Sequence, residues 1–217
     1  MFDARYYAYA SISALLVMSP GATMAVVMET AVADGRAAAL HTVLGVNIGN
    51  STLALASALG MSFVFTTWPS TLQFVKAGGA VYLTYLGLKG LWRMWNGFPP
   101  PAAVAPEGGT APRASADRAR FKRAPVIRGI ATNLLNPPVI LFYMTFLPQF
   151  IGPEDPFFAR FLVLAATHVS MSMVWLSMYA VALGLLAERM ARPLVRRTLE
   201  GLTGALLVGF GVRLLFR

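Results

Sequence analysis

The sequence predicts an all-α integral membrane protein of six transmembrane helices, arranged as two inverted three-helix repeats. The 217-residue chain is 57% hydrophobic and 12% charged, with a mean hydropathy of +0.62, which is more apolar than a soluble domain needs. Its apolar runs are long enough to cross a bilayer, which takes about 20 residues. Prolines interrupt the first apolar run of each half at matching places, as in transporters built from inverted repeats.

The first half contains three apolar runs joined by short turns. We read the first run as a retained span and not as a cleaved signal peptide, because it continues past Pro20 without a cleavage site. The turns Ala33–Arg36 and Thr66–Pro69 separate it from the two runs that follow. The predicted spans are Tyr6–Val32, Ala37–Phe65 and Ser70–Trp95.

The segment Asn96–Ala124 separates the two halves. It is rich in Pro, Gly and Ala and becomes basic from Arg113 to Arg123, which is the composition of a mobile linker and not of a folded domain. We therefore predict a first repeat over residues 1–95, a cytoplasmic linker over 96–124 and a second repeat over 125–217.

The second half also contains three apolar runs, which are predicted to span Pro125–Ile151, Phe157–Ala187 and Leu194–Phe216. The third and sixth spans share a pattern, LTYLGLKGL at 83–91 and LVGFGVRLL at 207–215, which matches Gly87 with Gly211. Because each half holds an odd number of spans, two such repeats have opposite orientations in the membrane.

Basic residues predict the orientation. With the linker in the cytoplasm, 13 of the 18 lysines and arginines lie on that side. The positive-inside rule then places both termini outside. The net charge of +9 reports this orientation and contact with anionic lipid, so we expect no nucleic-acid partner.

The chain offers little for catalysis or metal binding. It has no cysteine and only two histidines, His41 and His168, which argues against a thiol relay and a transition-metal path. No Ser-His-Asp or HExxH arrangement is recognisable. We therefore expect no enzyme activity, no cofactor and no metal site.

Several motifs resemble one transporter family. ADGRAAAL at 33–40, GVNIGN at 45–50 and RGIATNLLNPPVILFYMTFLPQF at 128–150 resemble the lysine-exporter family, often called LysE/RhtB, which includes homoserine/threonine exporters. The resemblance covers almost the whole chain except the linker, and TNLLNP followed by FLPQF is its most specific part. It implies a bacterial inner-membrane exporter of amino acids or similar small zwitterionic metabolites, driven by the proton gradient.

Two departures from the family pattern concern the substrate and the coupling mode. The usual PGP motif is Pro20-Gly21-Ala22 here, and many members carry an aspartate where this chain has Asn50. Neither departure affects the transporter class.

The first break, at Pro20, Gly21, Ala22 and Thr23, is a candidate binding site. Backbone amides after the proline begin a new half-helix, whose N-terminus can hold a carboxylate, and Thr23 can add a hydroxyl. The alternative is a proline kink satisfied by neighbouring side chains. We favour the binding interpretation because the second half carries a matching break.

The second break contributes Asn133, Asn136 and Pro137. The two asparagines share a helix face and either bind substrate or satisfy carbonyls freed by the proline. Asn47 and Asn50, on the second span, either pack helices together or contact substrate. Both interpretations stay open for each pair.

His168 and Glu29 are the candidates for proton coupling, because ionisable residues within the membrane are functional hypotheses by default. The alternative for His168 is a buried neutral imidazole bonded to a serine. Glu29 lies in the predicted cytoplasmic third of the first span.

The sequence thus predicts an exporter that alternates access around its two broken helices, with a small amino acid and membrane lipid as partners. Two alternatives stay open, a transporter of another small solute or ion and a non-transporting accessory subunit. Small residues at 79–87 and 204–211 can pack helices within one protomer or between the protomers of a homo-oligomer.

Overall fold

The computed structural model describes residues 3–67, 71–96, 124–182 and 192–215, and all regular structure in these ranges is helical. The predicted all-α class is therefore confirmed. The predicted linker lies almost entirely outside the described residues, as does the end of the fifth predicted span. The elements are α1 (Ala4–Met18), α2 (Ala22–Thr67), α3 (Thr71–Asn96), α5 (Pro125–Leu134), α6 (Pro137–Leu141), η1 (Phe142–Phe146), η2 (Leu147–Phe150), α7 (Phe157–Val181) and α9 (Pro193–Leu215).

The first predicted span is a broken helix. α1 ends at Met18, and Ser19 takes an extended conformation while its N–H donates back to the Leu15 and Leu16 carbonyls. Pro20 lacks the backbone donor that would continue the helix, so α2 begins only at Ala22. The break lies where the sequence places it.

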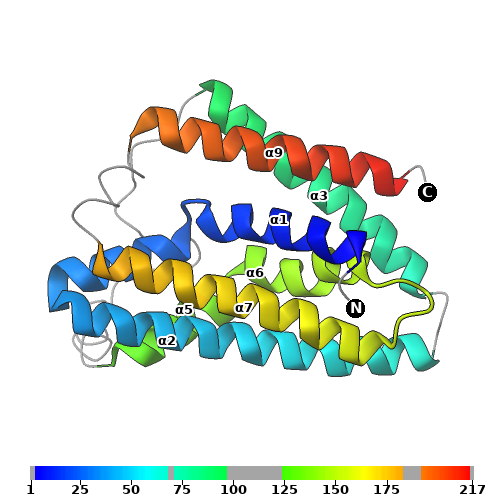
Figure 1. Cartoon of the computed structure of the whole chain (residues 1–217), viewed down its shortest axis with the longest axis horizontal. Coiled ribbons are helices and arrows are strands. Elements are labelled where there is room, and N and C mark those ends of the chain that lie inside the picture. The colour runs from blue at the N-terminus through cyan, green and yellow to red at the C-terminus, as the bar shows by residue number, and fades with distance from the viewer. Residues whose placement is uncertain (1–2, 68–70, 97–123, 183–191, 216–217) are drawn as a thin grey trace, which may run out of the picture.

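α2 contains a second interruption, at Gly35, which has φ 86° and ψ 174°. An L-residue with a side chain rarely adopts this conformation, whereas glycine adopts it readily. Gly35 falls in the turn predicted at 33–36 and divides α2 into a first arm (residues 22–34) and a second arm (residues 36–67). Figure 1 shows the second arm running back along the molecule.

The fourth predicted span is also broken. α5 ends at Leu134, Asn136 is extended, and Pro137 begins α6. The two parts are bent by 61°, and the second part continues through the π-helix η1 and the 3-10 helix η2. We call residues 4–34 the first broken helix and residues 125–150 the second broken helix.

The helices form layers, as Figure 1 shows. α3 and α9 pair along one side, α2, α5 and α7 lie together on the other, and α1 runs between them, in contact with α7 and α9. α1 begins and α9 ends toward the same end of the molecule, close to the turn that leads into α7.

Glycines allow α3 and α9 to approach closely, and their contacts are reciprocal. A Cβ on Gly87 would meet the Gly204 carbonyl oxygen at 2.6 Å and the Val208 nitrogen at 2.7 Å, whereas a Cβ on Gly211 would meet the Ala80 carbonyl and the Thr84 nitrogen. Each residue of one set lies 124 positions from its counterpart, namely 87 from 211, 80 from 204 and 84 from 208.

The described core consists of two hydrophobic clusters. The aromatic cluster lies around Tyr9, Phe146 and Phe161, whereas the aliphatic cluster lies around Val27 and Val43. α7 contributes residues 161, 164 and 165 to the aromatic cluster and residues 176, 179 and 180 to the aliphatic cluster. The middle of α7 is therefore left for polar side chains.

Two described helices are long and apolar enough to cross a membrane, residues 22–63 within α2, which include the interruption at Gly35, and the whole of α7. The second broken helix makes a third if its two parts count as one span. These helices support an integral membrane protein, while the count of six spans stays a prediction. α1 has only 15 residues because Pro20 follows it, and it is too short to span alone.

Candidate functional site

Three glycines position the candidate site by bringing α5 onto the second arm of α2. A Cβ on Gly45 would collide with the Val126 carbonyl, and a Cβ on Gly129 would collide with the Thr42 carbonyl. A Cβ on Gly49 would lie 2.9 Å from Oδ1 of Asn133. Small residues at such interfaces let helix backbones approach closely in membranes. This approach places Asn133 directly against α2.

Asn50 joins three helices. Its Oδ1 accepts a hydrogen bond from Nδ2 of Asn133 on α5 at 3.1 Å, and its Nδ2 donates to Oγ of Ser172 on α7 at 3.5 Å. All three side chains are buried, with exposures of 1% to 4%. The sequence singled out both asparagines but did not pair them, and Ser172 was not among the predicted site residues.

Asn47 and Asn133 each retain a buried acceptor. Nδ2 of Asn47 donates to the Val43 carbonyl at 2.9 Å and approaches Sδ of Met173 at 3.8 Å. Oδ1 of Asn47 and Oδ1 of Asn133 have no hydrogen-bond partner among the described residues. A buried acceptor without a donor is costly, so these oxygens are suited to an N–H or O–H group of a ligand.

His168 is buried on α7, one helical turn before Ser172. Its Nδ1 is hydrogen bonded to Oγ of Ser13 on α1 at 2.8 Å. Its ring packs against Phe142, with ring centroids 4.3 Å apart, and edge-on against Tyr143 at 5.9 Å. The serine partner matches one of the two interpretations from sequence, but the serine comes from the first broken helix and not from α7.

These contacts form separate buried sets that meet at neighbouring positions of α7, namely 168, 172 and 173, and we call them together the central polar network. They bring the first half of each broken helix to α7, because Ser13 precedes the break at Pro20 and Asn133 precedes the break at Pro137. The network lies at the middle of α7, between the two hydrophobic clusters. Its members are Ser13, Asn47, Asn50, Asn133, His168 and Ser172.

No hydrogen bond among the described residues links the first break to this network. Gly21 and Ala22 are exposed, and Pro20 and Thr23 are half-buried. Near this break, the hydroxyl groups of Ser19 and of Thr203 on α9 form a hydrogen bond of 3.3 Å in which either can donate. Backbone N–H groups of residues 22–24 precede the first helical bond of the second half-helix, which Ala25 makes to Gly21.

At the second break, Asn136 is hydrogen bonded through its own backbone groups. Its N–H donates to the Asn133 carbonyl, and its own carbonyl accepts from Val139 and Ile140. Its side chain is half-buried and makes no capping hydrogen bond. Pro137 is exposed.

Glu29 is outside the central polar network. It pairs with Arg128 on α5, with Nη2 and Oε2 2.5 Å apart, and its side chain is 57% exposed. Sequence reasoning counted Arg128 only toward orientation and missed this partner. The proximity of Glu29 and Arg128 depends on how α5 packs on α2, and no local sequence pattern predicts that packing.

A second group of charges lies at the opposite end of the molecule, where α1 and α7 begin. Arg160, on the first turn of α7, is 2% exposed and donates from Nη2 to Oδ1 of Asp3 at 2.5 Å. The Tyr6 backbone amide and the Arg160 guanidinium hold the pKa of Asp3 below its ordinary value of 3.8. The sequence signal for this group of charges is an arginine inside an apolar run, with acidic residues predicted on the same side of the membrane.

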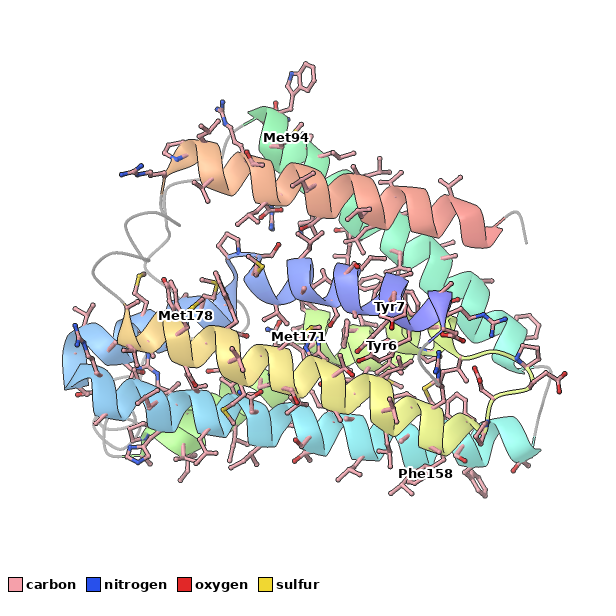
Figure 2. The ribbon with its side chains drawn as sticks, viewed as in Figure 1. Tyr6, Tyr7, Met94, Phe158, Met171 and Met178 are labelled. Atoms are coloured by element: carbon pink, nitrogen blue, oxygen red, sulfur yellow. The ribbon has the colours of Figure 1, made fainter. Side chains whose placement is uncertain are left out.

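Tyr6 extends the contact between α1 and α7, as Figure 2 shows where the two helices approach each other. Its hydroxyl lies 3.2 Å from Oγ1 of Thr167, and the Tyr9 hydroxyl donates to the Leu164 carbonyl at 2.9 Å. Together with the pair of Ser13 and His168, these bonds fasten α1 to α7 along its length.

The central polar network suits a small dipolar ligand. Its members offer amide and hydroxyl groups and one imidazole, and none carries a fixed charge. Within the described ranges, no group of three His, Cys, Asp or Glu side chains is placed to hold a metal ion.

Comparison with known proteins finds similarity to membrane transport proteins along almost the whole chain. Residues 14–217 match the family described as LysE type translocator. The chain is 31% identical over 186 residues to a homoserine/homoserine lactone efflux protein of Salmonella typhimurium, covering 86% of this chain and 82% of the relative. It is 28% identical over 208 residues to a threonine efflux protein of Escherichia coli, covering 95% of each. An uncharacterized membrane protein of Bacillus subtilis is 27% identical over 207 residues, covering 95% of this chain and 96% of the relative. No solved structure matches the chain.

Proposed function

The chain belongs to the LysE type translocator family, and from this premise we propose that it exports a small neutral amino acid, of the homoserine or threonine kind, across the bacterial inner membrane. Relatives named for homoserine/homoserine lactone efflux and threonine efflux support this substrate class. The observation that carries the proposal is the central polar network, which brings buried polar groups of both broken helices to the middle of α7 and holds no fixed charge. A cationic side chain such as that of lysine would enter this network without a counter-charge, at a high desolvation cost.

In the proposed complex, the substrate lies between the two broken helices. Its ammonium group donates to Oδ1 of Asn47 and Oδ1 of Asn133, the two buried acceptors that lack a donor. Its carboxylate binds the backbone amides of residues 22–24, with the Thr23 hydroxyl beside them, because a helix N-terminus carries partial positive charge. Carbonyl groups at the Asn136–Pro137 break also accept hydrogen bonds from the ammonium group.

Transport then proceeds by alternating access between two inverted repeats of three spans each. The reciprocal glycine contacts of α3 and α9 support this symmetry, because exchanging each residue for its counterpart 124 positions away turns one set of contacts into the other. The same register matches Gly87 with Gly211 in the sequence. Rocking of one repeat against the other would expose the site first to the cytoplasm and then to the outside, where both termini lie.

We assign proton coupling to His168, which is buried beside the substrate site and bonded to Ser13. Export by His168→Ala is expected to continue while losing its dependence on the pH gradient. Glu29→Gln is the matched comparison, because Glu29 is exposed and bound to Arg128. An unchanged pH-gradient dependence in both variants would exclude coupling through either residue.

The deciding experiment is export from cells preloaded with dipeptides that release homoserine, threonine or lysine, with and without the protein. Faster appearance of homoserine or threonine outside, with no change for lysine, is expected. The Asn47→Leu, Asn133→Leu double variant should abolish export, whereas Thr52→Val, an exposed position on the same arm of α2, should not. Faster export of lysine alone would contradict the proposed substrate class.

A further inference from the structure

We propose that the two broken helices are clamped to each other by an ion pair at each end, and that these two clamps are the inner and outer gates of the transport path. The gating role rests on the proposed transport function, whereas the two contacts are features of the fold. Each clamp joins the start of one broken helix to the end of the other.

The inner clamp joins α5 to the first arm of α2. Arg128, in the first turn of α5, pairs with Glu29 near the end of the first broken helix, at 2.5 Å. Nη1 of Arg128 also donates to Oγ1 of Thr30 at 3.5 Å. Thr30 is buried and bonded in turn to Thr42 on the second arm, at 3.3 Å. The guanidinium therefore closes the interface where α5 meets both arms of α2.

The outer clamp joins α1 to the end of the second broken helix. Nη1 of Arg5, in the first turn of α1, lies 3.8 Å from Oδ2 of Asp155, five residues beyond η2. The same oxygen accepts from the Gly152 amide at 2.7 Å and lies 3.8 Å from Nε of Arg160. Arg160 in turn holds Asp3, so Asp155 links the second broken helix to α1 directly and through α7.

The two clamps correspond to each other. In both, an arginine at the start of one broken helix meets an acid at or just past the end of the other. A two-fold relation between the halves produces this exchange, and the glycine contacts of α3 and α9 show the same kind of exchange. Exposed ion pairs contribute little to stability in general, but these two cross between elements that must separate for a path to open.

Chemical labelling tests the clamps without any substrate. The chain has no cysteine, so single reporter cysteines need no background changes. Ile12→Cys reports the outer half of the path and Val27→Cys the inner half, because both side chains are buried, on the first broken helix, on opposite sides of the break at Pro20. The rate of reaction with a water-soluble maleimide is measured in lipid nanodiscs, where both faces are accessible.

Asp155→Asn is expected to accelerate labelling of Ile12→Cys and to leave labelling of Val27→Cys unchanged or slower. Glu29→Gln is expected to accelerate labelling of Val27→Cys and to leave labelling of Ile12→Cys unchanged or slower. Loss of a partly exposed ion pair shifts an equilibrium by about 1.5- to 5-fold, which sets the expected change in rate. Glu154→Gln and Asp34→Asn, which are exposed neighbours outside the two clamps, serve as matched controls and should change neither rate.

Exchanging the inner charges, with Glu29→Arg and Arg128→Glu together, should restore slow labelling of Val27→Cys. Equal acceleration of both reporters by Asp155→Asn and by Glu29→Gln would indicate general loosening and would overturn the proposal, as would no change in either reporter. Selective labelling without export of homoserine or threonine would support the clamps while rejecting the proposed substrates.

Discussion

At the scale of single residues, the contacts of Asn50 require a side chain with both a hydrogen-bond donor and an acceptor. An amide can accept from Asn133 and donate to Ser172 at the same time, whereas a hydrophobic side chain can do neither. The bond between Asn50 and Asn133 spans 83 positions of the chain, so it ties the two halves of the chain together.

Asn50→Leu is therefore expected to destabilise the protein by about 1–3 kcal/mol, because Nδ2 of Asn133 is left buried without its acceptor. Unfolding in mixed detergent micelles measures this loss. Thr52→Val is the matched control, since Thr52 is exposed and its hydroxyl bonds to its own helix at the Ile48 carbonyl. Equal stability of both variants would mean that the hydrogen bond contributes nothing.

Asp3 gives the pH dependence of the contact between α1 and α7. Its folded-state pKa lies below 3.8, so its contribution to stability is complete above about pH 3.8 and is lost as the pH falls through the folded-state pKa. Asp3→Asn should lower the thermal midpoint by the same amount at pH 8 and pH 5.5, because Asp3 is ionised at both. The amount should be small, because Asp3 is partly exposed and solvent screens its ion pair. This difference should shrink below about pH 3.8. A difference that grows on acidification would contradict the assignment.

At the scale of elements, glycine determines how closely the helices pair. Gly45 and Gly60 lie on the same arm of α2 and differ in their surroundings, since a Cβ on Gly45 would collide with the Val126 carbonyl and one on Gly60 would meet nothing within 4 Å. The comparison separates helix packing from helix propensity.

Gly45→Ala is expected to destabilise the protein by about 1–3 kcal/mol and to reduce export, because α5 must move away from α2. Gly60→Ala should be neutral or stabilise by about 0.5–1 kcal/mol, since alanine loses less backbone entropy in a helix. Thermal unfolding in detergent gives the first quantity and the preloading assay the second. Similar behaviour of the two variants would show that the close approach is not required.

The interruptions of the helices could be predicted from sequence, whereas the contacts that form the site could not. Pro20 and Pro137 restrict the backbone locally and Gly35 permits a positive φ, so their effect does not depend on the rest of the fold. The pair of Ser13 and His168 depends on the register of two helices 155 positions apart. A serine in an apolar helix usually bonds to its own backbone, so nothing in the sequence distinguished Ser13.

At the scale of the whole molecule, the two groups of charges lie at opposite ends. Asp3, Arg5, Asp155 and Arg160 lie where α1 and α7 begin, and their contacts place the N-terminus beside the turn after η2. The distribution of basic residues likewise predicts that both segments lie on one side of the membrane. Which side faces the outside follows from the distribution of basic residues and stays a prediction.

Single cysteines test that orientation in intact cells. Glu154→Cys, in the exposed turn before α7, should react with a membrane-impermeant maleimide, and Asp34→Cys, beside the reversal at Gly35, should react only after the cells are lysed. Both positions are exposed, so each serves as the control for the other. The opposite pattern would invert the proposed topology and exchange the two gates.

The pairing of helices from opposite halves has a consequence for biosynthesis. The most extensive packing in the described part of the chain joins α3 to α9, while α2 and α3 hardly touch. A ribosome making about 5–20 residues per second needs roughly ten seconds to pass from Gly87 to Gly204, so the glycine face of α3 stays uncovered during that time. During that interval α3 lacks its main partner, so a fragment released or cleaved at this stage would lack the most extensive helix packing of the described chain.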